Sequence, residues 1–106
     1  MANKLHLITA VVQRKVGDAA VDAAMKAGAT GATYFGADGT GIRQRLGPLS
    51  AEIEASKRVV FIVTDAAHTD AVLDAVVKTA KLEDPGQGFA FVQDVIKAVG
   101  FVAARR

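Results

Sequence analysis

Two glycine clusters are the residues of this chain best suited to chemistry. Gly36, Gly39 and Gly41 follow one strand-like segment, and Gly86 and Gly88 precede another. Because glycine has no Cβ atom, its backbone N–H groups can turn toward an anion and approach it closely. Glycines beside strands also form ordinary turns, so each cluster alone is a weak signal. Neither cluster is a Walker loop or a dinucleotide fingerprint, because no Lys-Ser/Thr pair follows and no helix is expected after Gly41.

Between two predicted strands lies a long basic loop, about residues 38–57. It carries Arg43, Arg45 and Lys57, with Arg58 directly after it. A loop of this length in a compact domain is usually functional. The alternative is a flexible loop without a function, but the loop also contains Leu and Ile residues, which need a surface to pack against.

Patterns for catalysis or metal binding are weak. The chain has no Cys, and its two histidines, His6 and His68, form no paired motif, so a metal site is not expected and both are interpreted as structural. Ser50 and Ser56 have no neighbouring His, and no carboxylate pair is positioned for acid–base work. An acylphosphatase would need an Asn near the first strand, and Asn3 precedes that strand. Binding is favoured over catalysis, and no enzyme is predicted.

The elements that must position these residues follow from the apolar periodicity. It predicts strands over 4–12, 32–37, 58–64 and 89–93, and helices over 16–27 and 65–82, the second capped by Asp65. One further helical turn is predicted over 94–97. The βαββαβ order is typical of a ferredoxin-like α+β fold, with an antiparallel sheet of order 4-1-3-2 and both helices on one face. Both glycine clusters then lie at one end of the sheet, on opposite edges.

Composition limits the class of protein. One domain, residues 1–106, is expected at this length, and a net charge of +2 is too small to indicate nucleic-acid binding. No apolar run of about 18 residues and no signal peptide are found, so a cytoplasmic protein is the default. With little aromatic volume, the subunit would gain from burying more surface in a homo-oligomer.

Three segments of the sequence together resemble a known protein family. Residues 28–33, the Gly39-Thr40-Gly41 triplet and residues 85–95 resemble the PII signal-transduction family over nearly the whole sequence. The resemblance implies a trimer of ferredoxin-like subunits that binds adenine nucleotide between subunits and signals to a transporter or enzyme through a T-loop, here about 38–57. It also implies a B-loop at about 82–88 and a C-terminal tail at about 95–106. The implied nucleotide-binding residues are Thr33, Gly39, Thr40, Gly41, Ile62 (through its backbone), Gly86, Gln87, Gly88 and Phe89.

Departures from the family pattern narrow the expected ligand. Gln87 and Phe89 stand where other members have an acidic residue and a phosphate-binding Lys, and no Tyr occurs in the loop for uridylylation. Gly100 and Val102 replace an Arg-x-Arg pair. The resemblance therefore implies a divergent PII-like member. Its weak phosphate coordination implies binding of ADP or AMP in preference to ATP.

Some PII-like groups tied to carbon uptake or carboxysomes also sense bicarbonate. By this resemblance, the predicted anion and T-loop residues are Arg43, Arg45, Lys57 and Arg58, since charge-assisted hydrogen bonds to a small anion are strong. The alternative is a ligand-free trimeric interaction module of the same fold.

Overall fold

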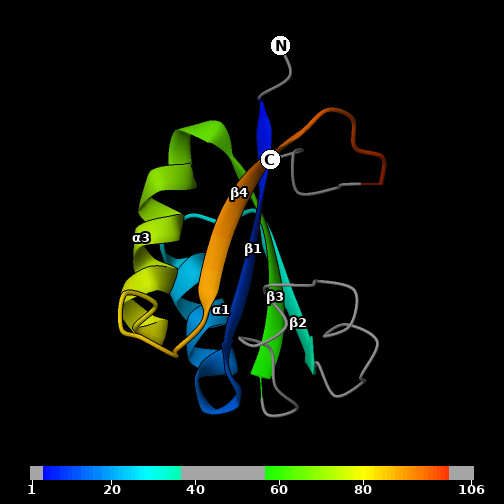
Figure 1. Cartoon of the computed structure of the whole chain (residues 1–106). Helices are drawn as coiled ribbons and strands as arrows, with labels where there is room; N and C mark the ends of the chain where they lie inside the picture. Colours follow the sequence, from blue (N-terminus) through cyan, green and yellow to red (C-terminus); the bar gives the residue numbers. More distant parts are fainter. Residues whose placement is uncertain (1–3, 37–56, 101–106) are drawn as a thin grey trace.

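The computed structural model describes residues 4–36 and 57–100. Two helices pack on one face of a single sheet (Figure 1). Along the chain the elements are β1 (Leu5–Gln13), the 3-10 turn η1 (Arg14–Val16), α1 (Gly17–Lys26), β2 (Gly31–Gly36), β3 (Lys57–Asp65), the 3-10 turn η3 (Ala66–His68), α3 (Thr69–Ala80) and β4 (Phe89–Val95).

The sheet has the strand order β2-β3-β1-β4, and every neighbouring pair is antiparallel. This order is the predicted 4-1-3-2 read from the other edge. The ferredoxin-like α+β fold expected from the element order is thus confirmed.

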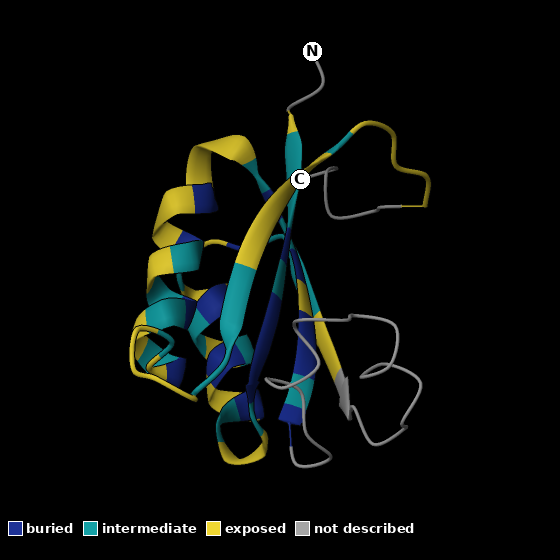
Figure 2. Cartoon of the chain, viewed as in Figure 1, coloured by how far each residue is buried: buried dark blue, intermediate teal, exposed yellow. Residues whose placement is uncertain are grey.

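A core fills the space between the helices and the sheet. Strands alternate their side chains between faces, and helices repeat theirs every three to four residues, so both patterns converge on one layer. Figure 2 shows the buried residues gathered there. The largest fully buried side chains of that layer are Ile8 and Val12 on β1, Val60, Ile62 and Thr64 on β3, and Val72 and Val76 on α3.

The opposite face of the sheet is also apolar, and no described helix covers it (Figure 1). The strand register places Thr33, Phe61, Thr9 and Phe91 in one row across this face. Phe61 is 37% exposed and Phe91 is 43% exposed. The Phe91 ring also stacks on the Phe89 ring, with centroids 6.3 Å apart. We call this surface the open face.

Several predicted boundaries differ from the structure. The predicted helical turn over 94–97 is wrong: Asp94 and Val95 pair with β1, which extends far enough to hold two more residues of β4. Asp65 does act as a cap, but for η3, and α3 begins only at Thr69. It ends at Ala80, because Lys81 adopts a left-handed conformation with φ 57°. Lys57 belongs to β3 and not to the loop.

Candidate effector site at one end of the sheet

The end of β2, at Gly36, and the turn before β4 lie at one end of the sheet, as predicted for these parts of the two glycine-rich segments. Phe35, Val59, Val11 and Phe89 form one row of the register, so the end of β2 and the start of β4 are level. They lie on opposite edges, three strand spacings of about 4.8 Å apart. Gly39, Thr40 and Gly41 lie outside the described residues.

The turn before β4 contains two glycines with different surroundings. At Gly88, with φ +138°, an added Cβ would lie 1.9 Å from the Val11 carbonyl oxygen, so this glycine allows the chain to meet β1. At Gly86, with φ +79°, an added Cβ would meet nothing within 4 Å. Gln13 donates from Nε2 to the Gly86 carbonyl oxygen at 3.3 Å and ties this turn to the end of β1. Gly86 therefore offers the open backbone that a ligand could approach.

Gln87 and Phe89 contribute no cation to this turn. The Gln87 N–H donates to the Asp84 carbonyl oxygen at 3.3 Å, so this donor is already used within the turn. Behind the turn lies a hollow of about 310 Å³ in which Glu83 is the charged lining residue. The remainder of its lining is Leu73, Val77, Leu82, Gly88, Phe89 and Ala90. An apolar hollow with one carboxylate does not favour a phosphate, so an anion would have to sit on the solvent side of the turn.

Thr33 and Ile62 occupy different environments. Thr33 is exposed on β2, at the edge of the open face. Ile62 lies in the middle of β3, with its side chain fully buried and both strand neighbours paired to it. Thr33 and the 86–88 turn therefore lie on opposite edges of the sheet of one subunit.

The described cations near the loop base are partly engaged. Lys57 is 3% exposed at the start of β3. Arg58 is half-buried, donates from Nη1 to the Lys57 carbonyl oxygen at 3.2 Å, and lies over Gly17 beside Tyr34. Arg43 and Arg45 lie outside the described residues.

A contact that sequence reasoning missed joins β2 to α1. The Tyr34 hydroxyl donates to the Asp18 carboxylate. This hydrogen bond, with a smaller contribution from desolvation, raises the pKa of Tyr34, while Arg58 opposes the rise. The strand alternation could have indicated this contact. Successive side chains of a strand point to opposite faces, so Tyr34, next to Thr33 on the open face, points toward the helices. The contact links β2 to the first turn of α1.

Asp65 and His68 form a second local pair at the other end of the sheet. Asp65 Oδ1 accepts from the His68 backbone N–H at 3.1 Å and lies 2.8 Å from the His68 Nδ1. The His68 side-chain hydrogen bond lowers the pKa of Asp65, against a smaller opposing effect of desolvation. The His68 ring packs on Gly28, where an added Cβ would lie 2.5 Å from Cδ2. This arrangement agrees with a structural interpretation of His68.

Among residues 4–36 and 57–100, no group of three or more His, Asp or Glu side chains is arranged to hold a metal ion. Within the same ranges, neither helix is long and apolar enough to cross a membrane.

Comparison with solved structures gives the same fold. The PII protein of Arabidopsis thaliana bound to citrate is 22% identical, with a TM-score of 0.64 over 88% of this chain and 78% of that one. CPII, a nitrogen regulatory PII-like protein from Thiomonas intermedia bound to ADP, AMP and bicarbonate, is 16% identical, with a TM-score of 0.59 over 87% and 88%.

A Bacillus cereus protein related to NIF3 has a TM-score of 0.66 at 15% identity, over 92% of this chain but only 26% of that one. No curated protein sequence matches the chain. The profile of the family described as nitrogen regulatory protein P-II, whose members are signalling regulators, matches residues 5–102. With this match over most of its length and the ferredoxin-like fold, the chain belongs to the P-II family of regulators.

Proposed function

We propose that this chain is a cytoplasmic, non-enzymatic homotrimeric regulator that binds ADP or AMP in preference to ATP between its subunits. Its T-loop, about residues 38–57, then signals to a target transporter or enzyme. The observation that carries the proposal is the open backbone of Gly86, which faces free space at the same end of the sheet as the end of β2. The nucleotides bound by the Thiomonas relative support the ligand class.

A trimer accounts for the separation of the site residues. Thr33 and the 86–88 turn lie on opposite edges of one sheet, so a cleft between two subunits can combine one edge from each. The open face, with Phe61 and Phe91 partly exposed, supplies apolar area that an assembly would remove from water.

The preference for ADP or AMP follows from the charge at the turn. Residues 86–89 contain no cation. On the solvent side of the turn, a third phosphate would add negative charge without a matching positive group in residues 86–89. We place bicarbonate as a second ligand at the loop base, where Arg43, Arg45, Lys57 and Arg58 concentrate positive charge along the chain.

Calorimetric titration of the full chain with ADP, AMP and ATP, with and without bicarbonate, tests the proposal. We expect heat with ADP and AMP and weaker binding of ATP. Gly86→Ala should weaken nucleotide binding while leaving the assembly intact. Gly31→Ala, where an added Cβ also meets nothing within 4 Å, is the control for an added methyl group without the positive φ of Gly86. An intact trimer that gives no heat with any nucleotide would favour the ligand-free interaction module instead.

A further inference from the structure

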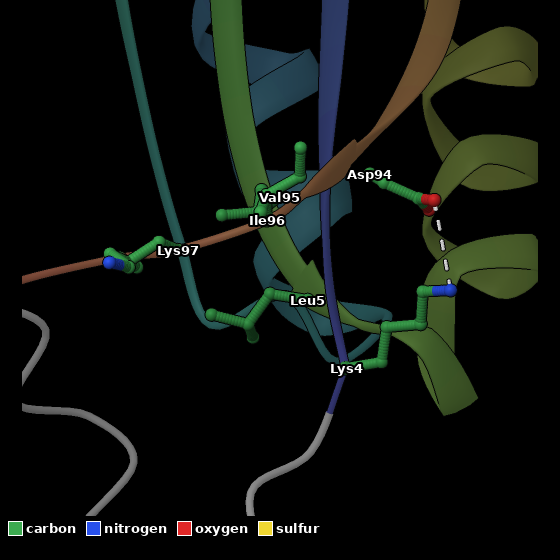
Figure 3. Close-up of a pocket in the computed structure, with 7 residues that line it drawn as sticks. Lys4, Leu5, Asp94, Val95, Ile96 and Lys97 are labelled. Carbon is green, nitrogen blue, oxygen red and sulfur yellow. Dashed lines mark ion pairs between the residues drawn. The ribbon is translucent and has the colours of Figure 1, made fainter.

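A hydrogen-bonded chain of side chains joins three elements at the end of the sheet remote from the candidate effector site. His6 on β1 lies between Thr69, the first residue of α3, and Asp94, near the end of β4. The His6 Nδ1 is 2.7 Å from the Thr69 hydroxyl, and its Nε2 is 3.2 Å from Asp94 Oδ1. Lys4 Nζ approaches the other Asp94 oxygen at 3.7 Å (Figure 3).

The directions of these hydrogen bonds determine the protons on His6. The buried Thr69 hydroxyl donates to the Asp65 carbonyl oxygen at 3.2 Å, so it is left to accept from the His6 Nδ1–H. The ionised Asp94 carboxylate can only accept, so it requires a proton on Nε2 as well. All three bonds are made together only when the imidazole carries both protons and a positive charge.

Loss of one proton from His6 must therefore break this chain. The imidazole then either presents a lone pair to the Asp94 carboxylate or forces Thr69 to turn away from the Asp65 carbonyl oxygen. In the first case Lys4 alone remains on Asp94, and that ion pair is weak because both side chains are more than 60% exposed. In the second case the His6 Nε2–H still donates to Asp94, but this hydrogen bond loses the positive charge of the imidazolium and is weaker. Four charged groups lie on the elements around His6. They are Lys4 directly before β1, Asp94 on β4, Asp65 at the end of β3, whose carboxylate is hydrogen-bonded to His68, and Asp70 in the first turn of α3.

The segment that this contact would control leaves the sheet directly afterwards. Asp94 is followed by Val95, the last residue of β4, and then by Ile96–Gly100, which forms no helix or strand. Ile96 is 97% exposed and Val99 is 89% exposed, so these apolar side chains make little contact within the described subunit. Lys4, Leu5 and residues 94–98 line a hollow of about 550 Å³ at this point (Figure 3).

We propose that His6 is a proton-operated latch for the end of β4. When His6 is doubly protonated, it clamps Asp94 between β1 and the start of α3 and sets the direction in which Ile96–Gly100 leaves the sheet. When His6 is neutral, the end of β4 loosens. Histidine side chains ordinarily change charge between about pH 5 and 8, so a change of pH across this range tests the latch. The inference does not depend on the proposed nucleotide binding.

Hydrogen exchange measured by NMR on the assembled full chain tests the latch. Protection factors of the amides from Gln93 to Val95, corrected for intrinsic exchange, should fall about threefold between pH 5.5 and pH 8. His6→Gln should abolish this dependence on pH. His68→Gln is the matched control, since His68 bonds Asp65 and not β4, and it should retain the fall.

A second variant protects the test against misfolding of His6→Gln. Asp94→Asn removes only the charge of an exposed side chain, and its protection at pH 5.5 should already equal the low value of the wild type at pH 8. A fall in protection that persists in both His6→Gln and Asp94→Asn, or that is absent from the wild type, would overturn the latch.

Discussion

At the scale of single residues, the two glycines that flank Gln87 perform different physical tasks. Gly88 lets β4 meet β1 without a clash, while Gly86 adopts a positive φ in open space. Gly88→Ala would push a Cβ into backbone that cannot move without separating the strands. We expect a loss of about 3 kcal/mol or more in the free energy of unfolding.

Gly86→Ala, in contrast, should cost only the strain of a left-handed alanine, about 1 to 2 kcal/mol. Denaturant unfolding of both variants at equal subunit concentration measures the difference. Equal losses for the two variants would contradict the packing role assigned to Gly88.

Asp65 gives the molecule a dependence on acid pH. Hydrogen bonding to His68 lowers its pKa in the folded state, so the unfolded chain binds this proton first as the pH falls. The stabilisation by the ionised carboxylate is complete above the unfolded-state pKa of about 4 and is lost as the pH falls through the lower folded-state pKa.

Asp65→Asn isolates this charge, because Asn also caps helices well. We expect the wild type to exceed the variant in thermal midpoint at pH 6, and we expect the gap to close as the pH falls below about 4. Thermal unfolding across pH at one subunit concentration measures it. A gap that is independent of pH would indicate that the carboxylate charge contributes nothing.

At the scale of elements, α3 is held by packing and not by surface pairs. Val72, Val76 and Ala80 follow the i, i+4 spacing and are almost fully buried against the sheet and α1. The exposed Lys78–Asp74 pair, with Nζ to Oδ2 at 3.2 Å, should add little. The buried face of α3, which packs against α1 and the sheet, should therefore contribute most of the stability that this helix gives to the fold.

Val76→Ala tests this view of α3. Removing two buried methyl groups and leaving a cavity should cost about 2 kcal/mol in the free energy of unfolding. Val99→Ala makes the same chemical change at a side chain that is 89% exposed, and it should change stability by less than about 0.5 kcal/mol. Similar losses for the two variants would mean that the helix face is not packed as described.

At the scale of the whole molecule, the open face is the surface through which we expect copies of the chain to associate. Phe91 is 43% exposed on the outer side of β4, where a neighbouring copy would bury it. Phe91→Glu should dissociate the proposed trimer into folded monomers, because a buried unpaired charge is costly. Sedimentation velocity measures the mass, and circular dichroism measures the retained fold.

Met25→Glu is the matched control for this dissociation. Met25 is 45% exposed, but it lies on α1, in the layer away from the open face. The Met25→Glu substitution should therefore leave the mass of the assembly unchanged. A wild type that is monomeric at all concentrations would remove the inter-subunit site, and a trimer that survives Phe91→Glu would place the interface elsewhere.

The sequence by itself determined the fold, because local signals agreed with one another. Alternating β-branched residues around Ile8 and Ile62 and the spacing of Val72 and Val76 each require one buried face, and only a sheet covered by two helices satisfies all of them. The antiparallel strand order then predicted that the end of β2 and the start of β4 lie at one end of the sheet, as the register shows.

Tertiary structure alone decided the finer chemistry of this protein. The close approach of Gly88 to Val11 and the contacts of His6 with Thr69 and Asp94 join residues more than 60 positions apart. The failure of the helical turn predicted over 94–97 has the same origin, since β1 offered a longer edge than the local pattern of β4 indicated. Periodicity reports which face a residue occupies, but the partner it meets across that face depends on how distant segments are brought together.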